Sequence, residues 1–337
     1  MSAILDRFQL GHVWTTVDPF LFCVHHLDHY PAGDGQMGPM ASLRGRNMGQ
    51  DFGGKDGWSM YHGTKVPGFP AHPHRGFETV TVVLQGLVDH FDSSGATGRY
   101  GEGDVQWMTA GAGLQHSEMF PLVHTDRENT LDLFQIWLNL PAADKMTTPG
   151  YTMLWAPSVP VLQEDGAEVR VIAGRWGDTM APAPPAASWA ADPSHRVGIV
   201  ILTLEAEASV TLPVEDGVER CLYHVNGGRA RVDGVELGPR TGLHLDATKA
   251  VLVEAGEEPL RVLMLQGQPI REPVAQHGPF VMNDRMGIVQ AFEDYQRTRF
   301  GGWSWGAPDV VHPASQGRFA QYADGRVERP DLEPKVG

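Results

Sequence analysis

Two short histidine-containing motifs constrain this chain more than any other feature of its sequence. His72-Pro73-His74 and His116-Ser117-Glu118 each carry two potential metal ligands at positions i and i+2. Alternate side chains of an extended strand point to the same face, so each motif presents two donor groups on one side of a sheet. Three imidazoles and one carboxylate suit a divalent transition metal and leave one or two positions open for water, dioxygen or substrate. The sequence therefore predicts that two strands bring His72, His74, His116 and Glu118 together around one ion.

The regions around the two motifs have the pattern of a β protein. The residues 78–87, 88–91, 105–109 and 131–140 form short, apolar or alternating runs that are separated by glycine-containing turns. Short strands at such spacing are typical of a barrel or a sandwich. The 40 glycines and 25 prolines of the chain also favour a turn-rich β fold over a helical bundle.

The second half of the chain repeats this pattern after a proline-rich loop at residues 181–194. Strands are expected at 198–204, 221–226 and 260–265. The length of 337 residues is sufficient for two domains. Two β units in tandem are therefore the expected architecture.

The C-terminal part contains one helix candidate. Apolar residues recur at helical spacing over residues 285–297, and Asn283 could serve as the N-cap. Residues 305–337 are polar and rich in proline and glycine, so a poorly ordered tail is expected there.

Composition and charge exclude several classes of function. With 26 basic and 41 acidic residues the formal net charge is −15, which argues against direct binding of nucleic acid or of an anionic membrane. No run of 18 apolar residues and no basic, apolar leader is evident. The two cysteines, Cys23 and Cys221, offer no disulfide framework, so the expected location is the reducing cytoplasm.

Six segments of the sequence resemble the pirin family of the cupin superfamily. They occupy residues 45–63, 72–81, 103–111, 116–119, 135–141 and 278–283, within a similarity that extends from about residue 18 to 302. The resemblance implies an all-β bicupin, which consists of two tandem cupin-type antiparallel β-barrels, here with a short C-terminal helix. The implied domains are an N-terminal barrel with the metal site at 1–150, a C-terminal barrel without metal at 151–280, and a helix and extended tail at 281–337.

The resemblance also implies a chemistry. The family pattern assigns the ligands to His72, His74, His116 and Glu118, with Fe(II) as the expected metal, although nickel, manganese, cobalt and zinc also accept these donors. An iron-dependent dioxygenase of the quercetin 2,3-dioxygenase type is expected, which acts on a flavonol-like aromatic substrate with dioxygen and uses Glu118 as catalytic base. The alternative is a redox-sensitive, metal-dependent regulatory protein that binds a protein partner without turnover.

Several further residues have open roles. Glu78 follows His74 at the position of the glutamate ligand of generic cupins, so it could be a ligand, but the family pattern favours a role in orienting an imidazole. His62, Gln115 and Arg75 could line the mouth of the site or be structural. Core packing is expected for a group of bulky strand residues: Trp107, Met108, Phe134 and Trp137.

Overall fold

The computed structural model describes residues 2–330, and its contacts divide the chain into two compact units. The first unit contains both histidine motifs and consists of residues 25–135, 142–157 and 272–330. The second unit consists of residues 2–24, 136–141 and 158–271. The units are thus discontinuous in sequence, whereas the domains expected from the sequence are continuous.

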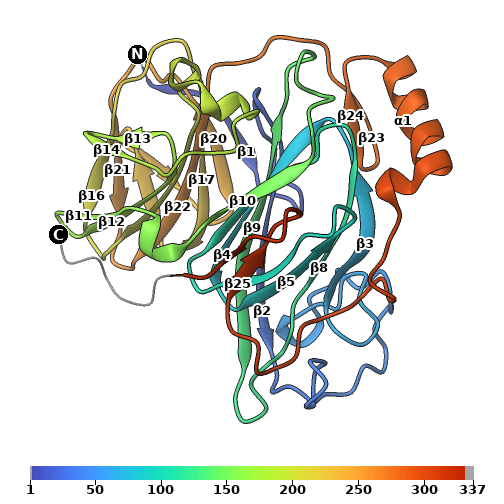
Figure 1. The fold of residues 1–337 in the computed structure, drawn as a ribbon. Helices are drawn as coiled ribbons and strands as arrows, with labels where there is room; N and C mark the ends of the chain where they lie inside the picture. The colour runs from blue at the N-terminus through green and yellow to red at the C-terminus, as the bar shows by residue number, and fades with distance from the viewer. Residues whose placement is uncertain (1, 331–337) are drawn as a thin grey trace. The chain divides into compact units, whose positions relative to one another are not determined.

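The first unit is built on two antiparallel sheets (Figure 1). The five-stranded sheet has the order β10-β7-β4-β9-β2, and the six-stranded sheet has the order β26-β25-β6-β5-β8-β3. A hairpin, β23 (Ala275–His277) and β24 (Phe280–Met282), completes the strands. The strands of the two sheets are β2 (Phe20–Tyr30), β3 (Gly68–His74), β4 (Phe77–Gln85), β5 (Leu87–Asp92), β6 (Thr97–Gly101), β7 (Val105–Thr109), β8 (Leu114–Met119), β9 (Asn129–Asn139), β10 (Gly150–Leu154), β25 (Phe319–Gln321) and β26 (Val327–Glu328).

The second unit contains a seven-stranded sheet of order β1-β20-β17-β22-β15-β12-β11 and a four-stranded sheet of order β16-β21-β18-β19. Its strands are β1 (Ile4–Gln9), β11 (Val161–Glu164), β12 (Ala167–Ala173), β13 (Arg175–Trp176), β14 (Thr179–Met180), β15 (Gly198–Leu204), β16 (Ser209–Leu212), β17 (Glu219–Gly227), β18 (Ala230–Val232), β19 (Val235–Leu237), β20 (Thr241–Leu245), β21 (Val251–Ala255) and β22 (Leu260–Gly267). Over both units, short 3-10 turns lie at Lys55–Gly57, Ala156–Ser158, Trp189–Ala191, Pro193–His195 and Arg299–Gly301.

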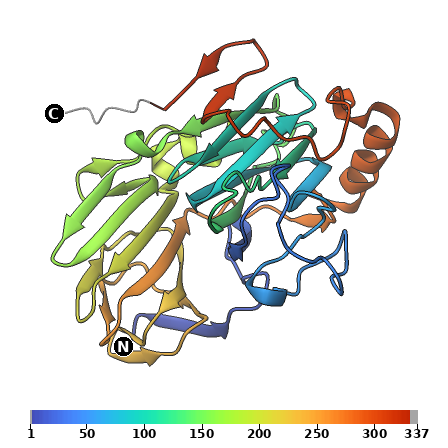
Figure 2. The ribbon, with the colours of Figure 1, turned by 90° about the horizontal axis from the view of Figure 1, so that it is seen from below.

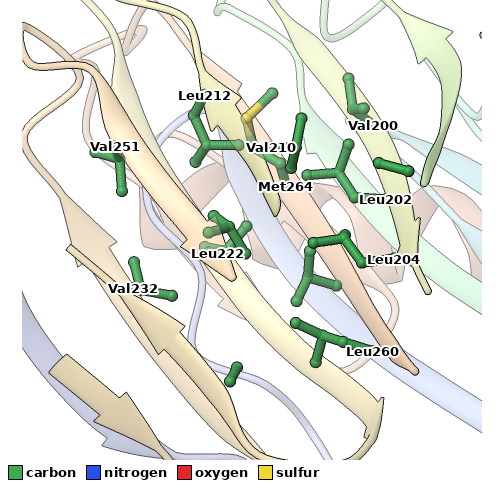
Figure 3. Packing of buried hydrophobic residues seen from close by; sticks show 14 of the residues in the cluster. Val200, Leu202, Leu204, Val210, Leu212, Leu222, Val232, Val251, Leu260 and Met264 are labelled. Atoms are coloured by element: carbon green, nitrogen blue, oxygen red, sulfur yellow. The ribbon is translucent and has the colours of Figure 1, made fainter. Parts of the chain in front are cut away.

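The interior of the second unit is filled by aliphatic side chains (Figure 3). On the paired strands β16 and β21, Val210 lies opposite Val253 and Leu212 lies opposite Val251, and all four are buried in this core. None of the four side chains can ligate a metal. This packing contrasts with the first unit, where the corresponding pairing of β3 with β8 places His72 opposite His116.

The predicted helix is present as α1 (Arg285–Thr298). The residue that caps it is Asp284, not the expected Asn283, because the Asp284 side chain accepts a hydrogen bond from the backbone N–H of Gly287. Phe292 packs against Phe280 of the β23–β24 hairpin at 4.8 Å between ring centroids. The helix therefore belongs to the first unit.

The expectation of a poorly ordered tail is wrong for residues 305–330. Strand β25 pairs with β6, and the tail supplies two strands at one edge of the six-stranded sheet (Figure 2). Arg99 of β6 donates hydrogen bonds to the backbone carbonyls of His312, Pro313 and Gln316. Tail composition is misleading here because backbone carbonyls of any residue type can accept these bonds.

No helix within residues 2–330 is long and apolar enough to cross a membrane. Cys23 and Cys221 are both free and buried.

Candidate metal site

Three histidines of the predicted set converge in the first unit. His72 and His74 come from β3 and His116 comes from β8, and their potential ligand atoms all lie within 4.8 Å of one another. The ring centroids of His72 and His116 are 4.5 Å apart, and those of His74 and His116 are 5.0 Å apart. The alternation of side chains along two paired strands produces this cluster, as the i, i+2 spacing predicts.

Hydrogen bonds at Nδ1 orient two of the three histidine rings. Nδ1 of His72 lies 2.9 Å from the carbonyl oxygen of Pro70, and Nδ1 of His74 lies 3.4 Å from that of Pro279. Such bonds fix the ring so that Nε2 can bind a metal. Both ring nitrogens of His116 are buried and have no hydrogen-bond partner among the described residues. Because buried polar atoms are rarely left unpaired, a metal ion is the partner that this site fits.

Burial keeps the three imidazoles neutral. It lowers the pKa of His72 to about 4 and places those of His74 and His116 well below the usual value. The neighbouring histidines lower the pKa of His116 further, because a charge on one ring disfavours a charge on the next. Neutral imidazole is the form that coordinates a metal.

Glu118 lies beside the histidine cluster. Its Oε2 is 4.0 Å from Nε2 of His116 and 3.3 Å from the amide nitrogen of Gln135, while Oε1 accepts hydrogen bonds from Thr81 at 3.0 Å and Tyr100 at 3.4 Å. Burial raises the pKa of Glu118, and these hydroxyl donors partly oppose that effect. Two hydroxyls therefore hold Oε1, while Oε2 accepts from Gln135 and faces His116.

Glu78 is not a member of the histidine cluster. It is buried on β4 opposite Thr109 of β7, and it accepts a hydrogen bond of 2.6 Å from the Thr109 hydroxyl. Its strand belongs to the five-stranded sheet, whereas His72, His74 and His116 lie on the six-stranded one. The cluster of converging ligand atoms contains neither Glu78 nor Glu118, so the choice between the two glutamates stays a prediction.

The residues that flank the motifs have different roles. Arg75 is buried, where it donates hydrogen bonds to the carbonyl of Ala112 at 2.7 Å and to Asp294 of α1 at 2.9 Å, so it is structural. Gln115 is also structural, because it accepts a hydrogen bond from the Tyr295 hydroxyl and donates to the backbone near α1. His62 is exposed and could line an opening. Of the bulky residues expected in cores, Trp107, Met108 and Phe134 are fully buried, and Trp137 is partly buried.

An aromatic cluster that no sequence pattern predicted lies beside the site. Phe69 lies 6.3 Å from the ring of His72, and Phe52 and His62 lie 6.3 Å and 5.6 Å from Phe69. Phe52 is 40% exposed although it contacts other rings. The position of Phe69, three residues before His72 on the same strand, is the one signal that it lies near the site. Phe52 lies in a glycine-rich loop without any periodic pattern.

Comparison with known proteins identifies the fold and the family. The pirin family pattern matches residues 11–138, and that of the pirin C-terminal cupin domain matches residues 199–301. A pirin-like protein from Caulobacter vibrioides is 42% identical over 234 residues, which are 69% of this chain and 80% of the relative. A Pseudomonas aeruginosa protein, provisionally named as a quercetin 2,3-dioxygenase, is 39% identical over 238 residues, or 69% of this chain and 79% of that protein.

A solved structure shows the same architecture. The quercetin 2,3-dioxygenase from Acinetobacter baumannii superimposes with a TM-score of 0.71 at 29% identity, over 90% of this chain and 99% of that one. The similarity confirms the predicted fold class, two tandem cupin-type β-barrels with a short C-terminal helix. With both family patterns matched and a relative 42% identical, the chain belongs to the pirin family.

Proposed function

We propose that this pirin-family protein is a metal-dependent dioxygenase of the quercetin 2,3-dioxygenase type. The observation that carries the proposal is the buried cluster of neutral histidines, in which neither ring nitrogen of His116 has a hydrogen-bond partner among the described residues. The names of the Pseudomonas relative and the Acinetobacter structure point to the same reaction. His72, His74, His116 and Glu118 would hold the metal, with iron as the expected ion.

The bound metal would act as a Lewis acid that favours the deprotonated form of a substrate hydroxyl. Glu118 would accept the proton from that hydroxyl, because Oε2 faces the histidines while Oε1 is held by Thr81 and Tyr100. The buried surroundings of the cluster would exclude water from the reacting atoms.

An aromatic substrate is supported by the ring cluster of Phe52, His62 and Phe69. These rings continue from His72 to an exposed position at Phe52, so a planar ring system could contact them while its oxygens reach the histidines. A flavonol combines a flat aromatic skeleton with adjacent oxygens. It is therefore the substrate class that we expect, with dioxygen as the second substrate.

Metal content provides the first test. Purified protein is expected to bind one divalent metal ion per chain, and His116→Ala should lose most of it because the variant removes the central ring of the cluster. His244→Ala is the matched control, since His244 lies in the second unit beside Glu219 and should leave metal content unchanged. Equal metal content in wild type and His116→Ala would refute the assigned site.

Oxygen consumption tests the reaction. Iron-loaded protein should consume dioxygen when quercetin is added, and Glu118→Gln should lower the rate by about 100-fold or more as expected for loss of a general base. Iron-loaded wild type that consumes no dioxygen with flavonols would refute the dioxygenase assignment.

A further inference from the structure

Gln135 belongs to a matched sequence motif, but the site described above assigns it no role in binding a substrate. It lies on β9, and its carboxamide is placed between Thr81 and Glu118. The Thr81 hydroxyl is 2.8 Å from Oε1 of Gln135 and 3.0 Å from Oε1 of Glu118, so its single proton is shared by two acceptors. Nε2 of Gln135 donates to Oε2 of Glu118 at 3.3 Å.

This network fixes the orientation of the amide. If the amide were flipped, its oxygen would face the carboxylate oxygen of Glu118, and two acceptors would repel each other. Nε2 of Gln135 is therefore directed toward Oε2 of Glu118, which is also the oxygen nearest to His116. Gln135 thus belongs to the immediate surroundings of the histidine cluster.

The amide nitrogen has a donor to spare. It carries two N–H groups, of which Glu118 uses one, and no residue in the described part of the chain accepts a bond from the other. Gln135 is also partly exposed, whereas His116 and Thr81 are fully buried. A ligand that enters the cluster could reach this donor.

We propose that Gln135 is a substrate-positioning residue of the metal site. From one amide nitrogen it would donate to Oε2 of Glu118 and to an oxygen of the substrate, so that the base and the substrate oxygen lie side by side. The residue would select substrates with an enolate or phenolate oxygen, because an anionic acceptor strengthens the bond. This inference rests on the proposed function and adds the group that aligns substrate and base.

The test compares Gln135→Leu with Gln85→Leu, the same substitution at an exposed position at the end of β4. Quercetin is titrated without oxygen into cobalt-loaded protein, and its affinity is read from the change in flavonol absorption. Loss of one hydrogen bond to an anionic oxygen should weaken quercetin binding of Gln135→Leu by about 10- to 30-fold, while Gln85→Leu binds like wild type. Cobalt binding by Gln135→Leu should retain its stoichiometry of one ion per chain.

The variant Thr81→Val tests whether the amide of Gln135 must be held in one position or only be present. It removes the hydroxyl that anchors Oε1 of Gln135, so binding of quercetin should weaken by a smaller factor than in Gln135→Leu. A quercetin affinity of Gln135→Leu within about twofold of that of wild type would overturn the inference. A loss of quercetin affinity that parallels a loss of bound cobalt would overturn it as well. If wild type binds quercetin but consumes no dioxygen, the proposed reaction fails and the role of Gln135 in binding is retained.

Discussion

The buried guanidinium of Arg99 is expected to hold the C-terminal tail on the first unit. Nε and Nη2 donate to the two carboxylate oxygens of Asp89 at 2.6 and 2.8 Å. Nη1 donates to the carbonyls of Pro313 and Gln316, and Nη2 also donates to that of His312. All five N–H groups of the side chain are thereby used, and both Arg99 and Asp89 are buried.

Replacement of Arg99 by methionine should therefore have a large effect. It keeps much of the side-chain volume but leaves the carboxylate of Asp89 buried without its cation, which costs about 3–5 kcal/mol in other proteins. The tail can leave the sheet so that water hydrates its carbonyl groups, and the decrease in the free energy of unfolding should therefore not greatly exceed this range. Urea denaturation measures the free energy of unfolding, and hydrogen exchange of residues 312–321 measures release of the tail.

Two companion variants make the test specific. Arg99→Met with Asp89→Leu removes both charges and should recover a substantial part of the lost stability, since an apolar pair avoids the unpaired charge. Arg326→Met removes an exposed arginine that pairs with Glu328 of the same tail, and it should leave the denaturation midpoint nearly unchanged. A loss below about 1 kcal/mol in Arg99→Met, with unchanged hydrogen exchange in the tail, would contradict the reasoning.

Three further predictions follow from buried groups elsewhere. Burial raises the pKa of Cys221 to about 11 and that of Cys23 well above its usual value. Neither thiol of the folded protein should therefore react with a disulfide reagent at pH 8, whereas two thiols per chain should react after unfolding. Burial raises the pKa of Asp28 from 3.8 to about 6, so the folded state binds a proton more tightly than the unfolded state does. The free energy of unfolding of wild type, relative to that of Asp28→Asn, should therefore fall by about 2–3 kcal/mol as the pH rises from 4 to 7. Urea denaturation at several pH values measures this difference, and a difference that does not change with pH would exclude the effect. Gly76→Ala should lower the denaturation midpoint, because Gly76 has φ +85° and an added Cβ would collide with the carbonyl oxygen of Val281; an unchanged midpoint would show that the backbone adjusts freely.

The features that the sequence predicts well are those set by local pattern. The strand at Val105–Thr109 coincides with the predicted run, and α1 begins at the predicted residue 285. The histidine cluster was predictable for the same reason, because i, i+2 spacing on a strand determines which side chains share a face. The structure places Oε2 of Glu118 4.0 Å from Nε2 of His116, whereas Glu78, which has the same spacing rule in its favour, lies on the other sheet. Which glutamate ligates a metal stays a prediction.

Features that depend on distant partners were not predictable in this way. Strand β1 (Ile4–Gln9) pairs with β20 in the second unit, although the chain between them contains most of the first unit. Phe52 reaches Phe69 from a glycine-rich loop, where no periodicity indicates direction. In both cases the partner lies outside the segment itself, and a local pattern contains no information about which distant edge or ring the segment meets.

The docking of the tail shows why composition alone misjudges such segments. A polar, proline-rich stretch lacks the apolar surface that normally offsets the entropy of ordering, so disorder is the ordinary expectation. Here the compensation comes from the strand that the tail contacts. Arg99 is buried in the docked structure, where its remaining N–H groups require acceptors and the tail carbonyls provide them. The tail contributes carbonyl oxygens, which every residue possesses, so its sequence need not differ from that of a disordered segment. A buried arginine with more donors than its carboxylate partner can satisfy is therefore the signal to seek, and it lies in the strand rather than in the tail.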